Sequence, residues 1–293
     1  MNEQCSICGG NGREYTRIAG ERGLFYRCSA CGLIWLAQDE QPIDDRTHYD
    51  AGYYKEHYSG RKDTMAAFGN RLSYIDTYIP KGADVLEVGA AAGDFLNVLE
   101  TRGYGVQGVE LSSHAVELAK RDHGYELFHG TLFDAGLPDE SCDAVVSYHV
   151  LEHVPDPLAL VAEMYRVLKP GGILVIEVPH ATGIDARFSR RLLKSILDYP
   201  HHRFAFSPAV LRSVVERTGF EVVTLDASPS FLVVNGIRRM RGWFTKSGKK
   251  KSGGGTAKVR VPVQSVHPRW YALAGKMLPG MRLTVVARKH DQT

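Results

Sequence analysis

Residues 85–96, VLEVGAAAGDFL, decide the fold, because a run of apolar residues passes directly into a turn of small ones. The first four have the apolar pattern of a buried parallel strand. Gly89 and Gly93 then bracket the turn, and a helix is expected from residue 93. Small residues let a ligand lie close to the backbone, and a helix N-terminus suits an anionic group. The stretch predicts a strand, a ligand-binding turn and a helix of an α/β protein, with a purely structural turn as the alternative.

Strand and helix patterns alternate on both sides of this turn. Apolar runs predict strands, and apolar residues at helical spacing predict the helices between them. The expected strands are 83–89, 106–111, 125–129, 143–149, 172–178, 221–226 and 282–288, and the expected helices are 64–78, 93–102, 112–123, 157–168 and 207–220. Alternation of this kind predicts an α/β sheet that binds its ligands at the carboxyl edge of the strands.

Two acidic residues stand close to the turn. Glu87 lies just before it, and Glu110 ends the next expected strand, where a carboxylate can bind ribose hydroxyls. The glycine spacing is GxxxG and not the GxGxxG of dinucleotide-binding proteins. Two glycines alone are a weak signal, so the prediction depends on the motifs that follow.

Those motifs are CDAVVSYHVLEHVPDP from Cys142 and RVLKPGGILVIEVPH from Arg166. Together with Glu110 and the turn, they make residues 64–226 resemble a class I S-adenosylmethionine-dependent methyltransferase. The resemblance implies a Rossmann-like seven-stranded sheet whose last strand is antiparallel, with S-adenosylmethionine as cofactor. It places the cofactor against Glu87, Gly89, Ala90, Ala91, Gly93, Glu110, Leu111, Leu132, Phe133 and His149. The chain departs from the family at Ala91, where a glycine is usual, and we expect the cofactor to fit with a shifted loop.

Catalytic candidates follow the fourth strand of this unit. Methyl transfer from a sulfonium requires mainly that the acceptor be aligned and its proton removed. A histidine near the carboxyl edge of the sheet can act as the base. His153 is the first candidate, with His149 and Glu152 beside it, and His180, His201 and His202 are weaker candidates. A hydrogen-bonded structural role is the alternative for each histidine.

The EHVPDP run, residues 152–157, is also similar to that of quinone O-methyltransferases, some of which bind a divalent metal nearby. Their additional acidic ligand falls at His149 here, which argues against such a metal in this chain. A quinone-type O-methyltransferase remains an alternative function.

Four of the five cysteines form two CxxC pairs, in CSIC and CSAC, with nineteen residues between them. This spacing predicts a zinc ribbon, in which two pairs of thiolates close a tetrahedral structural site. The ligands would be Cys5, Cys8, Cys28 and Cys31, within a small domain over residues 1–40.

The charge of the chain is unevenly distributed. Residues 227–290 contain fourteen of the 36 Lys and Arg and none of the 33 Asp and Glu, although the net charge is only +3. We therefore divide the chain into a Tyr-rich linker (41–63), a methyltransferase domain (64–226 and 281–293) with a substrate-binding insertion (180–206), and a basic insertion or tail (227–280). Arg187, Arg190, Arg191 and Lys194 of the substrate-binding insertion could hold a phosphate or sulfate, or form a solvated basic face.

The acceptor is predicted from the arrangement of these parts. A cysteine ribbon followed by a YDAGYY stretch and this domain is similar to methyltransferases that modify sugars of bacterial surface polysaccharides and natural products. The first hypothesis is thus a small-molecule or glycan acceptor, such as a phosphate-bearing saccharide hydroxyl. An RNA methyltransferase, in which the basic tail holds the phosphate backbone, is the second. A binding module on an inactive methyltransferase scaffold is the third.

The expected compartment is the cytoplasm. The first ten residues are polar, and no apolar run approaches the roughly 18 residues of a membrane span. Residues 231–251 combine Trp and Phe with arginines and lysines, which suits peripheral contact with the inner face of a membrane. A packed helix followed by a charged loop is the alternative for that segment.

Overall fold

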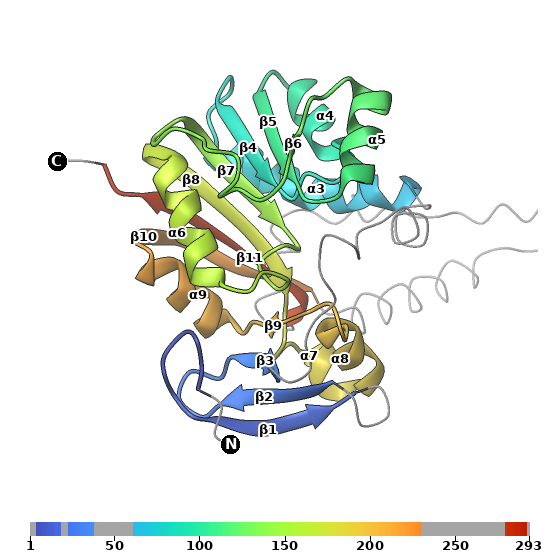
Figure 1. Ribbon diagram of the computed structural model, residues 1–293, viewed down its shortest axis with the longest axis vertical. Helices are drawn as coiled ribbons and strands as arrows, with labels where there is room; N and C mark the ends of the chain where they lie inside the picture. The colour runs from blue at the N-terminus through green and yellow to red at the C-terminus, as the bar shows by residue number, and fades with distance from the viewer. Residues whose placement is uncertain (1–3, 19–22, 38–60, 230–278, 292–293) are drawn as a thin grey trace, which may run out of the picture.

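The computed structural model describes residues 4–18, 23–37, 61–229 and 279–291. Two sheets organise this part of the chain: a large mixed sheet in the upper half of Figure 1 and a small antiparallel sheet below it. The Tyr-rich linker and the basic segment fall largely outside the described residues, as does the membrane contact predicted for residues 231–251.

The large sheet has seven strands in the order β10-β11-β8-β7-β4-β5-β6. β11 is antiparallel to both its neighbours, whereas the strands from β8 to β6 are parallel. The predicted seven-stranded sheet with an antiparallel last strand is confirmed. Its strands are β4 (Asp84–Val88), β5 (Gly105–Glu110), β6 (Phe128–His129), β7 (Cys142–Tyr148), β8 (Leu168–Pro179), β10 (Phe220–Pro229) and β11 (Pro279–Lys289).

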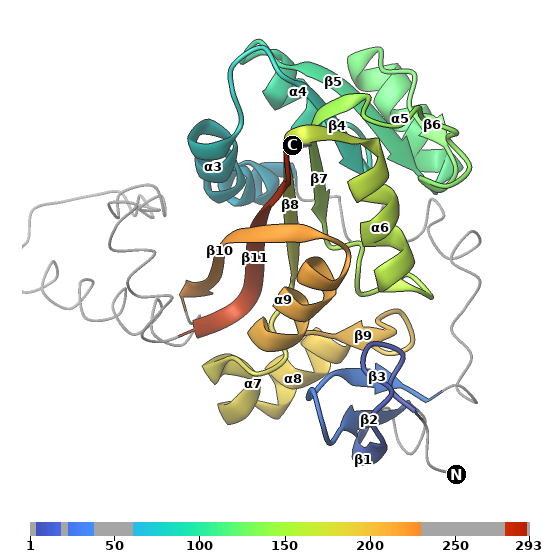
Figure 2. The same cartoon turned by 90° about the vertical axis from the view of Figure 1, so that its left-hand side faces the viewer.

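Helices cover both faces of this sheet, because alternate residues of its central strands are apolar on each side. On β7, Ala144 and Val146 pack with α3 (Arg61–Tyr78) and α4 (Asp94–Glu100). Val145 points the other way, into the core formed with α6 (Pro157–Val167) and α9 (Pro208–Arg217). Figure 2 shows the two layers on opposite sides of the sheet.

Three helices begin where capping residues predict. Ser112 caps α5 (Ser113–His123), since its side chain accepts a hydrogen bond from the Ala115 N–H. Asp156 and Ser207 cap α6 and α9 in the same way, and each is followed by a proline at the first helical position. These caps fix the residues at which the three helices begin. The site lies at the carboxyl ends of the strands, beside the loops that lead into these helices.

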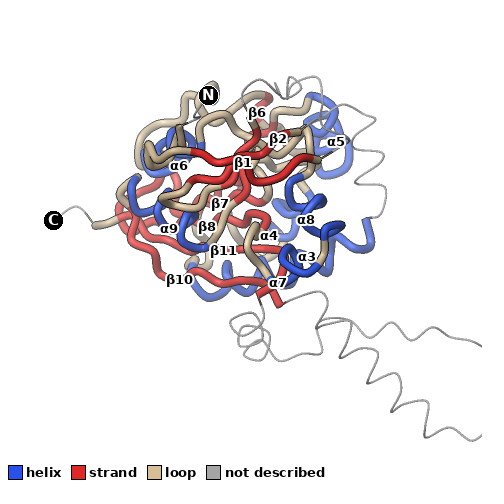
Figure 3. The backbone as a smooth tube through the Cα atoms, turned by 90° about the horizontal axis from the view of Figure 1, so that it is seen from below, coloured by secondary structure: helices blue, strands red, loops and turns tan. Residues whose placement is uncertain are grey.

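The small sheet has the order β1-β2-β3-β9. β1 (Gly12–Arg17), β2 (Leu24–Cys28) and β3 (Ile34–Leu36) come from the cysteine-bearing N-terminus. The fourth strand, β9 (Phe204–Ala205), comes from the insertion after β8, which also forms α7 (Ile184–Phe188) and α8 (Arg190–Leu197). The sequence did not predict this shared strand. In Figure 3, seen from below, the small sheet lies across the end of the main domain.

The described part of the chain contains no helix long and apolar enough to span a membrane.

Candidate functional site

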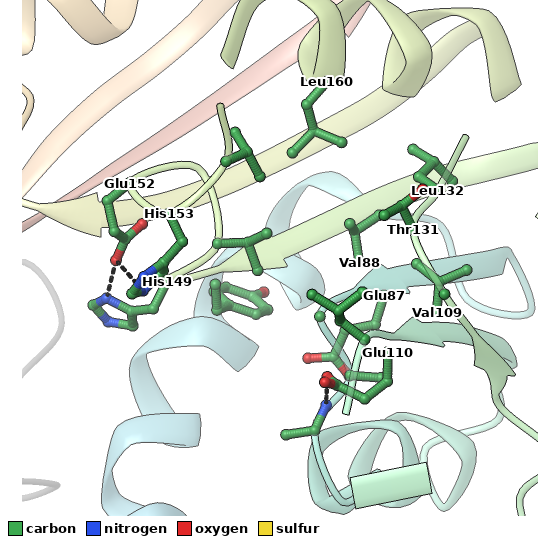
Figure 4. A pocket seen from close by; sticks show the side chains of 18 of the residues that line it. Glu87, Val88, Val109, Glu110, Thr131, Leu132, His149, Glu152, His153 and Leu160 are labelled. Atoms are coloured by element: carbon green, nitrogen blue, oxygen red, sulfur yellow. Dashed lines mark hydrogen bonds and ion pairs between the residues drawn. The ribbon is translucent and has the colours of Figure 1, made fainter. Parts of the chain in front are cut away.

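A cavity of about 630 Å³ opens at the carboxyl ends of β4, β5 and β7. Its volume lies in the range typical of small-molecule sites. It has two ends, which Figure 4 shows. Glu87 and Glu110 lie at one end, and His149, Glu152 and His153 lie at the other.

The turn after β4 forms one wall of the cavity. Gly89 has φ +78°, and a Cβ at this position would lie 2.4 Å from Val150 Cγ2, so a side chain here would require Val150 to move. Ala91 has φ +49°, in the left-handed region that an L-residue adopts at a cost. The family's usual glycine at this position is therefore replaced by an alanine that keeps a glycine-like conformation.

Glu110 ties the turn to the end of β5. One carboxylate oxygen accepts a hydrogen bond from the Ala91 N–H and the other from the Ser112 N–H, each at 2.8 Å. Burial raises the pKa of Glu110, and these hydrogen bonds partly offset the rise. Each oxygen keeps a second lone pair with which it can accept a hydroxyl.

Glu87 is buried at 3% exposure, and its Oε2 has no hydrogen-bond partner. Burial raises the pKa of Glu87 to about 8, so the carboxyl is protonated at neutral pH. An unpartnered buried oxygen that lines a cavity can accept a hydrogen bond from a donor of the ligand.

The structure brings together most of the residues that the sequence predicts to bind the cofactor. Nine of the ten line the cavity, and Gly93 is the exception. Gly93 begins α4 with φ +75°, and a Cβ there would lie 3.0 Å from the Tyr125 ring. Its role in the described structure is to let the chain turn into the helix. The cavity lining from the predicted set comprises Glu87, Gly89, Ala90, Ala91, Glu110, Leu111, Leu132, Phe133 and His149.

At the other end of the cavity, His149 lies between two buried carboxylates. Its Nδ1 lies 3.2 Å from Glu152 Oε1, and its Nε2 lies 3.3 Å from Glu177 Oε1. Burial lowers the pKa of His149, but the two carboxylates outweigh this effect and raise it to about 9. The ring is thus an imidazolium at neutral pH, which suits it to hold the two acids and excludes it as a base. Its φ of +59° turns the ring into this position.

His153 has the opposite protonation state. Burial lowers its pKa to about 4, so the ring is neutral at pH 7. Its Nδ1 lies 3.1 Å from the His201 carbonyl, which can only accept, so Nδ1 carries the proton. Nε2 is then the basic nitrogen, and it lies 4.0 Å from Glu152 Oε1. His153 can therefore accept a proton within the cavity.

A further histidine, His202, reaches the cavity from the insertion after β8, and Asp198 accompanies it. The sequence marked His202 only as a weaker base candidate. Its Nδ1 donates to the Ile196 carbonyl at 2.6 Å, and its ring lies 4.7 Å from that of His153 in an edge-to-face arrangement. Donor atoms of Glu152, His153 and His202 lie within 4.8 Å of one another. Three donors at this spacing could hold a divalent cation.

The other sequence candidates lie elsewhere. His180 is buried at the end of β8, where Nδ1 donates to the Gly280 carbonyl at 2.9 Å, so its role is structural. The basic residues of the insertion, Arg187, Arg190, Arg191 and Lys194, are not among the residues that line the cavity.

The four cysteines of the two CxxC pairs come together in the N-terminal unit. Cys5 and Cys31 sulfurs are 3.7 Å apart, and Cys8 and Cys28 sulfurs are 3.4 Å apart. A tetrahedral Zn–S₄ site with bonds of about 2.3 Å requires sulfurs about 3.8 Å apart. A Cβ on Gly10 would lie 2.9 Å from Cys28 Sγ, so the glycine leaves room for the cluster. The arrangement fits a metal.

A family model described as "Methyltransferase domain" matches residues 55–225 of the chain. A probable S-adenosylmethionine-dependent methyltransferase of Mycolicibacterium smegmatis is 31% identical over 146 residues, which are 48% of this chain and 53% of that protein. A ubiquinone biosynthesis O-methyltransferase of Thiobacillus denitrificans is 36% identical over 110 residues, 35% of this chain and 47% of that protein. The chain thus spans about half the length of the curated relatives that it matches.

Solved structures show the same fold at low identity. An S-adenosylmethionine-dependent methyltransferase of Archaeoglobus fulgidus superposes with a TM-score of 0.55 at 21% identity, over 81% of this chain and 98% of that one. One from Mesorhizobium loti gives a TM-score of 0.52 at 17% identity, over 76% of this chain and all of that one.

Proposed function

The chain belongs to this methyltransferase domain family, and we propose that it transfers a methyl group from S-adenosylmethionine to a hydroxyl of a small-molecule or glycan acceptor. The observation that carries the proposal is the two-ended cavity. Its cofactor end holds Glu87, Glu110 and the turn of small residues, and its acceptor end holds the neutral His153 beside the buried carboxylate of Glu152.

The residues of the cofactor end fit S-adenosylmethionine. Glu110 has free lone pairs for two ribose hydroxyls, and its hydrogen bond from Ala91 couples the ribose contact to the turn. The unpartnered Glu87 Oε2 can accept a hydrogen bond from the amino group of the methionine part of the cofactor. Leu132 and Phe133 stand where a flat apolar ring can pack, and Phe133 is 53% exposed before anything covers it.

The bound cofactor supplies a methyl group that its sulfonium has already activated. The acceptor end then has to align a hydroxyl and remove its proton as the new bond forms. His153 lines the cavity and its Nε2 is unprotonated, so it takes this proton. Glu152, ionised because His149 lowers its pKa to about 2, stabilises the resulting imidazolium from 4.0 Å. His149 holds Glu152 in place.

For the acceptor class we propose a saccharide hydroxyl. Two observations support it. An N-terminal cysteine unit precedes this domain, and the acceptor end is lined by polar residues, namely histidines, carboxylates and Asp198 from the insertion. A hydroxylated ring can hydrogen-bond to all of these groups.

A quinol hydroxyl is the second candidate. Its support is the ubiquinone O-methyltransferase relative and a demethylmenaquinone methyltransferase of Listeria welshimeri, which is 31% identical over 131 residues, 41% of this chain and 51% of that protein. Under this reading Glu152, His153 and His202 would hold a divalent cation, which would polarise the acceptor hydroxyl. The third donor comes from the insertion, as His202, and not from position 149.

A labelled-methyl transfer screen tests these alternatives. The purified protein, with labelled S-adenosylmethionine, is offered nucleotide sugars, lipid-linked glycans, demethylated quinols and RNA. We expect label in a saccharide, without stimulation by added divalent cation. Methylation of a quinol that depends on added divalent cation would favour the second candidate over the first. Methylation of RNA would contradict both candidates.

For the N-terminal unit we propose a structural zinc ion bound by the four cysteines. With all four positions filled by thiolates, the ion has no open site for chemistry. One equivalent of zinc per chain, lost on replacement of Cys8 by serine, is the expected result of metal analysis; a metal-free protein with unchanged stability would contradict it.

A further inference from the structure

The small N-terminal sheet is completed by a strand of the catalytic domain. β9 pairs with β3 in antiparallel register, Ile34 opposite Ala205 and Trp35 opposite Phe204. The Leu36 N–H also donates to the Arg203 carbonyl at 2.9 Å. The cysteine-bearing unit is therefore hydrogen-bonded to the backbone of the insertion that enters the cavity.

The same short stretch holds the acceptor end of the cavity. The backbone N–H groups of Arg203 and Phe204 both donate to the carbonyl of Glu152, at 2.8 and 3.1 Å. The carbonyl of His201 accepts from His153, and His202 itself lines the cavity. Residues 201–204 thus connect to β3 through one set of backbone groups and to Glu152 and His153 through another.

The cysteines determine whether β3 can stay in place. Cys31 lies three residues before β3, within a turn that spans residues 28–33. Hydrogen bonds from the Cys28 N–H to the Leu33 carbonyl and from the Gly32 N–H to the Cys28 carbonyl close this turn. Among its described residues, the unit forms three short strands of its own. A unit this small depends on a metal or a partner for its stability. Loss of the metal should therefore release β3 and, with it, β9.

The cofactor end has no backbone pairing with the small sheet in the described residues, although both contribute side chains to one apolar core. Glu87, Glu110 and the turn after β4 belong to β4 and β5, in the middle of the large sheet, and they are held by Val109, Ser112 and each other. Within the described residues, the small sheet pairs with the catalytic domain through β9 and not through these strands.

We infer that metal binding by Cys5, Cys8, Cys28 and Cys31 positions the acceptor-end residues Glu152, His153 and His202 through the shared strand β9, and leaves the cofactor end unchanged. The N-terminal unit then supports the acceptor end of the cavity through this shared strand. The terms acceptor end and cofactor end rest on the proposed function, but the coupling itself is a property of the backbone.

Hydrogen exchange followed by mass spectrometry on the full chain tests this coupling without any acceptor. Zinc-loaded protein is compared with protein stripped by a chelator and with stripped protein to which zinc is returned. We expect at least tenfold faster exchange in peptides covering residues 24–36 and 201–206 after stripping, reversal by zinc, and unchanged exchange in residues 84–96. The Cys8→Ser variant should match the stripped protein, and Cys142→Ala, which removes the cysteine outside the cluster, should match the loaded one.

Two outcomes would overturn the inference. Faster exchange confined to residues 24–36 would show that β9 holds its position without the cysteine unit, and faster exchange in residues 84–96 would show that the cofactor end is not independent. Calorimetry with S-adenosylhomocysteine on the same samples gives the second readout: its affinity should change less than twofold on stripping. Absence of binding even by zinc-loaded protein would count against the proposed function, and the exchange data would still decide the coupling.

Discussion

His149 Nε2 lies 3.3 Å from Glu177 Oε1 and joins this strand-β8 carboxylate to the loop after β7. Arg71 Nη2 approaches the same oxygen at 3.0 Å from the other side, and its guanidinium lies over the Tyr148 ring at 4.0 Å. These contacts lower the pKa of Glu177, although burial alone would raise it. Arg282 Nη1 lies 3.7 Å from the same Glu177 oxygen, so the buried carboxylate next to the acceptor end is held by three cations.

Replacement of His149 by glutamine should destabilise the protein, because Glu152 and Glu177 would lose a shared charged donor. Loss of one member of a fully buried ion pair costs about 3–5 kcal/mol. The His149 side chain is 38% exposed to the cavity, so we expect about 1–3 kcal/mol. Urea unfolding at pH 7 measures the difference, and a stability equal to that of the wild type would contradict the assigned ion pairs.

Replacement of His153 by glutamine should remove the base and leave cofactor binding intact. General base catalysis contributes typically about 10²–10⁴-fold, so the turnover number should fall by that factor. The affinity for S-adenosylhomocysteine should not change. His201→Gln is the matched control, since His201 contributes its backbone carbonyl to His153 and that carbonyl is retained. Wild-type turnover of His153→Gln would exclude this residue as the base.

The buried carboxyl of Glu87 should make stability depend on pH. Its pKa is raised to about 8 in the folded protein, against about 4.3 in an unfolded chain. The folded state therefore binds more protons between these values, and the free energy of unfolding should fall as the pH rises through this window. Glu87→Gln should lack this part of the decline. Urea unfolding of both proteins at about pH 5 and about pH 8, which span most of this window, tests it. Parallel pH dependences would refute the assignment.

The left-handed conformation of Ala91 should be relieved by glycine. An L-residue in this region costs about 1–2 kcal/mol, whereas glycine loses about 0.5–1 kcal/mol of unfolded-state entropy. Ala91→Gly should therefore be neutral or stabilising by up to about 1 kcal/mol. The neighbouring Ala92→Gly is the control, because Ala92 is buried and has no positive φ, and it should destabilise. Equal destabilisation by both variants would show that the turn does not hold Ala91 under strain.

Most of the catalytic fold could be predicted from the sequence, because strand and helix periods in residues 83–178 are strong and local. The expected strand 143–149 corresponds to β7, and the expected helix 157–168 to α6, within one residue at each end. The expected strand 125–129 is reduced to β6, Phe128–His129. Tyr125 and Leu127 instead belong to a small apolar cluster with Leu96 of α4 and Ala119 of α5.

The contributions of the insertion could not be predicted in the same way. His202 lines the cavity just before β9, whose pairing with β3 joins segments about 170 residues apart through two residue pairs. No local period marks such a short strand. The protonation states of His149 and His153 are likewise set partly by neighbours distant in sequence: Glu177, together with the nearby Glu152, for the first, and burial with the His201 carbonyl for the second.

The most direct test of the account is a calorimetric titration of the zinc-loaded protein with S-adenosylhomocysteine, the cofactor product, alongside the Glu110→Ala variant. We predict micromolar binding, weakened about 10- to 100-fold in the variant, because charged hydrogen bonds to the ribose contribute about 1.5–3 kcal/mol. Glu126→Ala, which removes an exposed carboxylate paired with Lys120, should bind like the wild type. No binding by the well-folded wild-type protein, or equal affinity of the Glu110→Ala variant, would contradict the assignment of this cavity as the cofactor site.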